Sequence, residues 1–471
     1  MIDRLESLIK PSEFETFVES LAARPPKSIR PRVDRLNKKT DPIFPFDTTP
    51  VPWYPQGQRV LDPNIRPGGF LEYAAADYYI QDAGSMLPLA MLDIQPEDQV
   101  CDLCAAPGGK ATAIAEMLGP NGFLLANEVI ASRLDVLRYA LARTGRANAW
   151  VSNQDPESLA ECLAGTFDKV LVDVPCSGQS LVGRKRQSES SFTTSHVQHC
   201  AARAERILRS ALRLVRPGGR LVLSTCTFAV EENEAQVQSM LESYPDALAV
   251  VPCRSLEAWE SPILAGCYRL WPHRDQCAGG FAASIVVQHQ IEPQAFKPSG
   301  RSDRRSQRES QRPNGSRKPI PRTCDLDQQF SKLGMLKLSL TREASLCVGF
   351  EPGAERFLQE HGNRIGQGLR IAQVDRDRLE PYHGLSMLLE SLFTPSNVLD
   401  LDDSNAKRYM LGESLDRALA SNQPEIAQTP WSVVRWKEKP LGWVKSASNR
   451  WNNYLPSWAR FTSFATTDGC D

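Results

Sequence analysis

Between residues 91 and 290, short apolar runs alternate with amphipathic stretches, and this pattern predicts the elements of the central part of the chain. Five apolar runs predict strands at Gln99–Leu103, Phe123–Asn127, Ala149–Ser152, Lys169–Asp173 and Arg220–Ser224. Stretches with helical spacing predict helices at Lys110–Leu118, Ala131–Thr144 and Cys200–Leu214, the last stopped by Arg216-Pro217-Gly218-Gly219. Strands that alternate with helices are typical of βαβ units, so we expect an α/β fold around a mostly parallel sheet.

The regions on either side of this part have a different pattern. Residues 1–90 open with a helical stretch, continue through a basic, Pro-rich segment at 24–32 and predict a small N-terminal α+β module. Residues 291–327 combine Arg and Lys with Ser, Gln, Gly and Pro, and apolar residues nearly vanish. This composition predicts a disordered basic linker, which serves as a tether, as a sequence-independent phosphate-binding segment, or as both.

From residue 328 to 471 we expect a C-terminal module in which Trp and Tyr are interleaved with Lys and Arg. Aromatic side chains can stack on bases while cations hold phosphates, but aromatics of a small β-rich domain are more often part of its core. We therefore expect most of these aromatics to be buried. The candidate nucleic-acid contacts are Lys445, Arg450, Asn452 and Asn453.

Composition narrows the class of protein only a little. The 471 residues leave room for about three domains, and a hydrophobic fraction of 41% is ordinary for globular protein. Twelve cysteines without a disulfide-scaffold spacing, and the lack of an apolar run of about 18 residues, lead us to expect a cytoplasmic chain with no membrane contact. Cys101 and Cys104 have no second pair at zinc spacing, so we expect no metal. The net charge of −1 does not itself indicate a nucleic-acid partner.

A glycine turn after the first predicted strand is the candidate cofactor loop. Small residues from Cys104 to Lys110 allow the backbone to approach a ligand at this strand–helix crossover. Glu128, at the end of the second strand, is placed to accept hydrogen bonds from ribose hydroxyls, and Asp155, after the third, is a candidate for an adenine amino group. A nicotinamide cofactor prefers GxGxxG, which is absent here, so S-adenosylmethionine is favoured. The alternative is an ordinary turn flanked by solvated acids.

Two cysteines follow predicted strands. Cys176 comes three residues after Asp173, and Cys226 follows the strand that ends at Ser224, so both thiols are expected at one crevice outside the carboxyl ends of the strands. Two thiols and an acid beside a methyl donor suit methylation of a pyrimidine at carbon 5. A thiolate adds to carbon 6, carbon 5 attacks the methyl group, and the acid forms a hydrogen bond with ring nitrogen 3. The alternative is a pair of buried structural cysteines.

With these residues assembled, the chain resembles the Nol/Nop/Sun RNA cytosine-5 methyltransferases, especially their RsmF-like bacterial branch. The resemblance rests on the glycine loop, on 173–178 and 224–227 around the two cysteines, and on Glu231-Glu232-Asn233-Glu234. It extends to 77–88 upstream and to 440–443 and 449–456 downstream. The sequence departs from the family pattern at Arg32-Val33-Asp34, at Gly178-Gln179-Ser180 and at Asp155-Pro156-Glu157.

The resemblance implies a Rossmann-like S-adenosylmethionine-dependent methyltransferase domain at 91–290. An N-terminal RNA-recognition module precedes it, and a PUA-like RNA-binding module follows the linker. Cys226 is implied to be the nucleophile and Cys176 to assist proton removal and release, with Lys110 and Asp173 near the target base. The residues implied to surround the cofactor are Cys104, Ala105, Ala106, Pro107, Gly108, Gly109, Lys110, Glu128, Asp155 and Asp173.

The implied partner is RNA, with ribosomal RNA or a small ribosomal subunit as the first expectation and a monomer as the oligomeric state. Transfer RNA and DNA cytosine remain alternative substrates. A catalytically inactive RNA-binding or ribosome-assembly factor with the same fold is the alternative function.

Overall fold

The centre of the computed structural model, which describes residues 5, 8–36, 44–184, 189–292, 330–362, 365–375, 378–420 and 430–465, is an eight-stranded sheet. Its order is β10-β12-β9-β8-β5-β6-β7, and β11 pairs with β12 outside this path. Strands β5 to β9 are parallel, whereas β12 runs antiparallel to β9. The strands are β5 (Gln99–Asp102), β6 (Phe123–Asn127), β7 (Ala149–Ser152), β8 (Phe167–Asp173), β9 (Val215–Thr225), β10 (Leu248–Val250), β11 (Cys267–Leu270) and β12 (Gly280–Val287).

All five predicted strands are present, and β6 and β7 have the predicted bounds. The helix before Arg216–Gly219 ends at Leu214, as predicted, but that segment itself lies inside β9, because the chain turns directly from the helix into the strand. The three antiparallel strands at 248–287 were not predicted. They complete one edge of the sheet, and their pairing is made over long sequence distances that local pattern does not report.

Helices cover both faces of this sheet, which explains why its strands are apolar on both sides. Along β5, Val100 packs toward one hydrophobic cluster and Cys101 toward the other. The first cluster holds α4 (Leu89–Leu92), α5 (Gly109–Met117) and α6 (Leu134–Ala142). The second holds α7 (Pro156–Cys162), α8 (Thr194–Leu214) and α9 (Glu234–Ser243).

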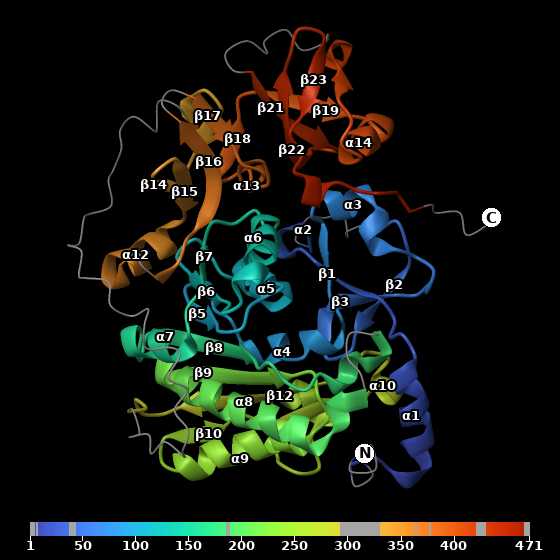
Figure 1. Cartoon of the computed structure of the whole chain (residues 1–471), viewed down its shortest axis with the longest axis vertical. Coiled ribbons are helices and arrows are strands. Elements are labelled where there is room, and N and C mark those ends of the chain that lie inside the picture. Colours follow the sequence, from blue (N-terminus) through green and yellow to red (C-terminus); the bar gives the residue numbers. More distant parts are fainter. Residues whose placement is uncertain are drawn as a thin grey trace.

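An N-terminal module lies along one side of the central domain (Figure 1). Its four-stranded sheet has the order β2-β3-β1-β4. A buried ion pair, Arg30 Nη1 to Glu116 Oε2 at 2.5 Å, joins this sheet to α5. The elements are α1 (Phe14–Ala22), β1 (Ser28–Pro31), α2 (Val33–Leu36), β2 (Thr48–Val51), β3 (Tyr54–Val60), α3 (Leu71–Ala74) and β4 (Tyr78–Ile80). The module thereby lies beside the helix that follows the glycine loop.

The C-terminal part, coloured orange to red in Figure 1, contains two larger sheets and a short two-stranded one. The first larger sheet consists of β14 (Ser339–Glu343), β15 (Leu346–Phe350), β16 (Leu369–Asp375) and β17 (Arg378–Pro381). The second has the order β19-β21-β22-β23-β20, from β19 (Val398–Leu401), β20 (Leu415–Asp416), β21 (Trp431–Trp436), β22 (Lys439–Ser446) and β23 (Arg450–Asn453). The remaining elements of this part are β13 (Gly334–Leu336), β18 (Phe393–Pro395), α12 (Pro352–His361), α13 (His383–Ser386) and α14 (Asp403–Met410). The short helix α10 (Pro272–Asp275) belongs to the central part, between β11 and β12.

The C-terminal part docks on the edge of the central sheet. Val151 of β7 and Gln367 exchange two backbone hydrogen bonds of 2.9 Å, so this strand edge is paired rather than left open. Glycine allows the close approach, since a Cβ on Gly368 would lie 2.4 Å from the Trp150 ring. Leu71 and Ala75 of the N-terminal module also join the hydrophobic cluster of the five-stranded sheet.

The predicted domain boundaries at 90, 290 and 327 remain predictions, and the predicted basic linker lies outside the described residues except for 291 and 292. Trp431, Trp443 and Trp451 are buried, as expected for core aromatics. Asn453 donates to the carbonyls of Tyr409 and Glu413 within its own module. Among the described helices, none combines the length and the apolar character needed to cross a membrane.

Candidate active site

A cavity of about 690 Å³ opens at the carboxyl ends of β5, β8 and β9, where ligands of open α/β sheets bind. The glycine loop, the end of β8 and the end of β9 form its floor, and β4 of the N-terminal module forms part of its wall. Of the predicted site residues, Cys104, Ala105, Ala106, Pro107, Gly109, Lys110, Asp173 and Cys226 line it. The structure therefore brings together most of the predicted cofactor loop, the acid and one of the two thiols.

Gly108 shapes the loop at the start of α5. Its φ of +116° lies in the region that favours glycine, and a Cβ there would come within 2.7 Å of the Ala140 Cβ on α6. The next residue, Gly109, faces Gln81 and Tyr79 of the N-terminal module, 3.4 and 3.5 Å from where its Cβ would be. The backbone of the loop thus passes between α6 and β4, which fixes its position in the cavity wall.

Lys110 and Asp173 form an ion pair inside the cavity. The Lys110 Nζ lies 2.6 Å from Asp173 Oδ2, and the Ser224 hydroxyl donates to Asp173 Oδ1 at 2.7 Å. Burial lowers the pKa of Lys110, but the charge and hydrogen bond of Asp173, with Asp102 nearby, outweigh it and raise that pKa above its ordinary value. Lys110 is therefore a positively charged donor at neutral pH, and it and Ser224 fix the orientation of the Asp173 carboxylate.

The two predicted thiols are in direct contact. The Cys176 and Cys226 sulfur atoms lie 3.2 Å apart, and the Cys226 backbone N–H donates to the Cys176 sulfur at 3.3 Å. The hydrogen bond with Cys226, together with burial, raises the pKa of Cys176 well above its ordinary range. Cys176 thus keeps its proton and can donate it toward the other sulfur. Cys226 lines the cavity and Cys176 does not, so the sulfur open to a substrate is Cys226.

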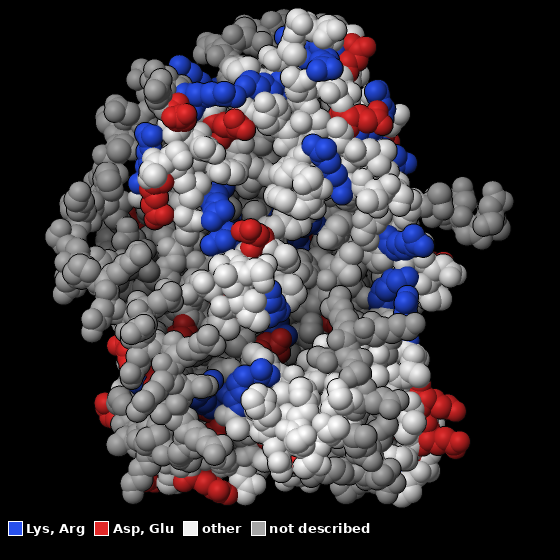
Figure 2. Space-filling model, viewed as in Figure 1, with Lys and Arg blue, Asp and Glu red and all other residues white. Residues whose placement is uncertain are grey.

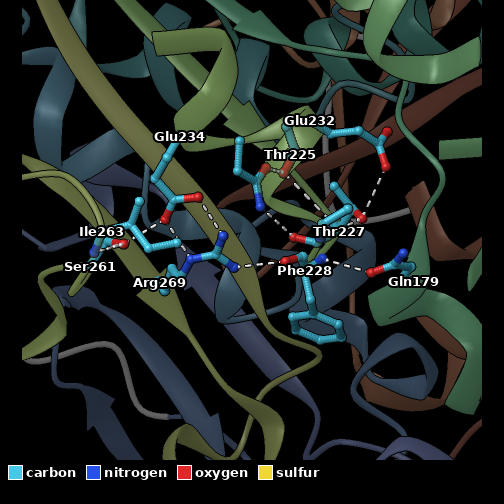
Figure 3. Close-up of polar contacts among 11 residues, drawn as sticks. Gln179, Thr225, Thr227, Phe228, Glu232, Glu234, Ser261, Ile263 and Arg269 are labelled. Atoms are coloured by element: carbon cyan, nitrogen blue, oxygen red, sulfur yellow. Dashed lines mark hydrogen bonds and ion pairs between the residues drawn. The ribbon is translucent and has the colours of Figure 1, made fainter. Parts of the chain in front are cut away.

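A buried carboxylate ties together the two loops that carry the thiols. Glu232 accepts hydrogen bonds from the Ser177 N–H (2.8 Å), the Ser177 hydroxyl (2.5 Å) and the Thr227 hydroxyl (3.2 Å). Burial raises the pKa of Glu232, and these donors oppose the rise. Gln179, at a departure from the family pattern, adds a second link by accepting from the Phe228 N–H at 3.1 Å (Figure 3).

The next acid of the same segment anchors this network to the antiparallel edge of the sheet. Glu234 is buried and forms an ion pair with Arg269 of β11, whose Nη1 donates to the Phe228 carbonyl at 2.9 Å (Figure 3). Ser261 donates to Glu234 Oε1 at 2.5 Å. The acidic segment 231–234 therefore holds the thiol loops in place through hydrogen bonds and an ion pair. Its buried residues, Glu232, Asn233 and Glu234, do not line the cavity.

Three predicted cofactor residues are not part of the cavity lining: Gly108, Glu128 and Asp155. Glu128 is buried and engaged, accepting from the Ile130 N–H at 2.9 Å and pairing with Arg133 at 3.0 Å. It nevertheless lies near enough to the loop for its charge to raise the pKa of Asp102 and of Cys104. Asp155 is exposed and caps α7 by accepting from the Glu157 N–H at 3.0 Å. The structure thus places Asp155 as a helix cap on the surface.

Asp102 is a cavity residue that the sequence analysis did not single out. Its side chain is buried at the end of β5, and neither carboxylate oxygen has a hydrogen-bond partner within the described part of the chain. Burial raises its pKa to about 7, against the opposing charge of Lys110 and the approach of the Cys104 backbone N–H, which does not reach hydrogen-bond geometry. The signal in the sequence was its position, the last residue of a strand that leads into the glycine loop. Three further residues line the cavity: Tyr79, Gln81 and the exposed Arg24. The sequence analysis noted the segment 77–88 only for the family resemblance and the segment 24–32 only for its basic charge and prolines.

The sheet order, the glycine loop after β5 and the residues gathered at the strand ends define a Rossmann-like methyltransferase. A family model for the 16S rRNA methyltransferases RsmB/F matches residues 89–286, and a model for the RsmF PUA domain matches 396–461. The chain is 33% identical to the ribosomal RNA small subunit methyltransferase F of Enterobacter sp. (strain 638), over 88% of this chain and 84% of that protein. It is 30% identical to the protein of the same name from Vibrio parahaemolyticus, over 87% and 85% of the two chains. The chain belongs to the RsmB/F family of methyltransferases.

Solved structures agree with this assignment. A methyltransferase homolog protein from Pyrococcus horikoshii is 26% identical, with a TM-score of 0.50 over 60% of this chain and 96% of that one. NSun6 from the same organism, solved with SFG, has a TM-score of 0.50 at 18% identity, over 61% and 97% of the two chains, and shares the fold. The predicted fold class, the family and the enzyme class are therefore confirmed, including the PUA-like C-terminal domain.

Proposed function

We propose that this protein transfers a methyl group from S-adenosylmethionine to carbon 5 of a cytosine in small-subunit ribosomal RNA, through a covalent adduct on Cys226. One observation carries the proposal: two thiols lie 3.2 Å apart at the strand ends, and only Cys226 faces a cavity that also contains the Lys110–Asp173 pair. Methyl transfer to most nucleophiles needs no thiol, whereas carbon 5 of a pyrimidine needs a nucleophile at carbon 6 first.

The residues around the glycine loop fit S-adenosylmethionine. This cofactor carries an α-ammonium group, and the unpartnered, buried carboxylate of Asp102 is a suitable acceptor on the cavity wall. Gly108 and Gly109 leave the loop without side chains where its backbone approaches the ligand, and Glu128 stands at the end of the neighbouring strand for the ribose hydroxyls. The bound cofactor supplies an electrophilic methyl group on its sulfonium.

In the proposed reaction the Cys226 thiolate adds to carbon 6 of the cytosine, and carbon 5 then takes the methyl group. Asp173, held by Lys110 and Ser224, is placed on the N3 side of the ring to accept a hydrogen bond from the cytosine amino group, and the Lys110 ammonium offsets the negative charge that builds on the ring. A base removes the proton from carbon 5, and elimination of the Cys226 thiolate restores the aromatic ring and releases the product. Cys176, in contact with Cys226, is proposed to assist this release.

The substrate reaches the cavity as an unpaired or flipped nucleotide, since a ring carbon inside a helix is inaccessible. Exposed Arg24 and the neighbouring prolines at the cavity mouth belong to the N-terminal module, which we propose recognises RNA. The names of the related proteins support small-subunit ribosomal RNA over transfer RNA or DNA. A cytoplasmic location and a monomeric state, expected from the sequence, are part of the proposal.

The test is transfer of labelled methyl from S-adenosylmethionine to RNA, with nucleoside analysis of the product. We expect 5-methylcytosine in small-subunit ribosomal RNA, and a loss of at least about 10³-fold in rate for Cys226→Ala, because the nucleophile is removed. Cys162→Ala is the matched control, since Cys162 is an exposed thiol on α7 outside the cavity.

Three other outcomes discriminate the alternatives. Label in transfer RNA keeps the mechanism and changes the substrate, and label in duplex DNA removes RNA as the target. Binding of cofactor and RNA without any transfer supports the inactive assembly factor. Undiminished activity of Cys226→Ala contradicts the nucleophile assignment.

A further inference from the structure

A second cavity, of about 390 Å³, lies where the C-terminal part meets α6, away from the residues that line the active site. Three regions far apart in the sequence line it: residues 135–151 (α6, the loop after it and β7), residues 368–384, and residues 456–458. Lys and Arg side chains lie on the visible face of the molecule between β16 and α6 (Figure 2). The hydrogen bonds between Val151 and Gln367 fix these segments relative to one another at the edge of the cavity.

The cavity carries guanidinium groups in excess of carboxylates. Arg138, Arg146 and Arg370 line it, and Asp135, with its side chain 86% exposed, is the one acidic residue in the lining. Arg138 pairs with Asp135 at 3.1 Å and Arg146 with the buried Glu351 at 3.3 Å, but Arg138 Nε and Arg146 Nη2 are buried and have no hydrogen-bond partner within the described residues. Burial, and then the charge of Arg370, lower the pKa of Arg138, while the hydrogen bond and charge of Asp135 oppose this shift. Unsatisfied cationic donors of this kind favour a bound anion.

Aromatic side chains stand beside these cations. Trp458 is 55% exposed, the most exposed Trp in the described chain. Its ring packs against Tyr139 in a tilted arrangement, with the ring centroids 4.2 Å apart. Tyr382 is also exposed, at 38%. The other tryptophans of this part of the chain, such as Trp443, are buried in the core. A large aromatic ring left half in solvent beside arginines is an arrangement that stacks on nucleobases.

His383 adds a neutral polar group at the base of the cavity. It is buried, its Nδ1 has no hydrogen-bond partner in the described residues, and it packs edge-on against Trp458 at 5.5 Å. Burial, followed by the charge of Arg143, lowers its pKa to about 3, so the imidazole is neutral at physiological pH. A neutral imidazole offers one donor and one acceptor, which suits the polar edge of a base.

We propose that this cavity binds one unstacked nucleotide of the RNA substrate, with its base on Trp458 and its phosphate on Arg138 and Arg370. The inference rests on the proposed function, because it deepens how the RNA is held. A volume of about 390 Å³ falls in the range of small-ligand sites. The opposite face of α6 contacts the glycine loop through Leu137 and Ala140. An RNA strand held at the cavity is therefore one helix away from the cofactor loop.

The experiment measures the affinity of the full-length protein for protein-free small-subunit ribosomal RNA over a series of salt concentrations, together with kcat and KM for methyl transfer. The variants are Trp458→Ala and the double variant Arg138→Gln/Arg370→Gln. Trp458→Phe tests rescue by another ring. The control is Arg378→Gln, an exposed arginine of β17 in the same part of the chain that does not line the cavity.

We expect Trp458→Ala to weaken RNA binding by about 5- to 100-fold, as for loss of one stacked base, and Trp458→Phe to restore most of it. The double variant should weaken binding and reduce the slope of log Kd against log salt by about 1 to 2, because up to two phosphate contacts are lost. KM should rise as the affinity for RNA falls, while kcat stays within about two-fold, and Arg378→Gln should change neither.

Unchanged RNA affinity in folded variants, verified by their urea midpoints, overturns the proposal. Variants that bind free RNA normally but bind the assembled small subunit weakly also overturn it, and they point to a ribosomal protein as the occupant. If the wild type binds RNA through this cavity but transfers no methyl group, the proposed function fails and the nucleotide site stands. If methyl transfer is normal and the variants are indistinguishable from wild type, the nucleotide site alone fails.

Discussion

The active-site cavity and the cavity beside α6 are both built from side chains of several segments, but they differ in how fully their cationic side chains are hydrogen-bonded. In the active site the Lys110 cation is satisfied by Asp173, which in turn is held by Ser224. In the cavity beside α6, three arginines line the wall with one acid, Asp135. Arg138 and Arg146 each have a carboxylate partner, but one donor atom of each has no hydrogen-bond partner within the described residues.

The difference reflects what each cavity has to do. Chemistry at a ring carbon needs groups fixed before the substrate arrives, and a paired, hydrogen-bonded carboxylate is preorganised in this way. Binding a polyanion instead gains from cations whose counter-charges come with the ligand. Asp102, whose carboxylate has no hydrogen-bond partner within the described residues, follows the second rule with the opposite sign, since it is suited to a cationic ligand group.

The largest effect that sharpens this comparison is expected from Cys176→Ala. The change removes the thiol proposed to assist release while leaving Cys226 in the cavity, so a covalent complex with RNA should accumulate and turnover should fall by about 10²-fold or more. The complex is measured as RNA-linked protein that resists denaturation in detergent. Cys176→Ala/Cys226→Ala is the control and should form no complex. Absence of a complex in the single variant would contradict the proposed role of Cys176.

A smaller effect is expected in the pH dependence of stability without cofactor. Burial raises the pKa of Asp102 to about 7, so the folded state holds this proton at pH values where the unfolded chain has released it. The free energy of unfolding should therefore fall as pH rises from about 4 to about 7, by at most about 4 kcal/mol from this group. Asp102→Asn should lack this loss, as measured by urea unfolding from pH 5 to 8.

Asp246→Asn provides the control for this measurement, because Asp246 is exposed and should leave the wild-type slope unchanged. A wild-type slope that persists in Asp102→Asn would show that another group titrates in this window.

The smallest effect separates the two kinds of tryptophan. Trp458→Ala should change the free energy of unfolding by no more than about 0.5 kcal/mol, because the ring is 55% exposed. Trp443→Ala, at a buried position, should cost about 3–5 kcal/mol. Urea unfolding of both variants measures the difference. A large loss of stability for Trp458→Ala would assign Trp458 to the core and break the contrast between the two cavities.

Local pattern was sufficient where a residue's role follows from its place on a strand. Continuous apolar runs along β5, β6 and β8 mark strands that are buried on both faces, and the loops after these strands meet at one edge in any parallel sheet. Asp173 and Cys226 were therefore predicted to share one crevice, the resemblance added Lys110, and the structure brings all three to one cavity. The same reasoning missed the antiparallel edge strands, whose partners are distant in sequence.

By itself, the sequence determined the α/β class, the glycine loop and the placement of the thiols after strands, because periodicity and strand-end position are local properties. The tertiary structure alone decided which thiol faces the cavity, that Asp155 caps a surface helix, and that Asp102 has no hydrogen-bond partner in the described residues. It also decided that Trp458 is exposed beside Arg138 and Arg370 while Trp443 is buried. Each of these outcomes depends on contacts between segments that the chain brings together only by docking, and burial or exposure of a given residue type is set by those contacts.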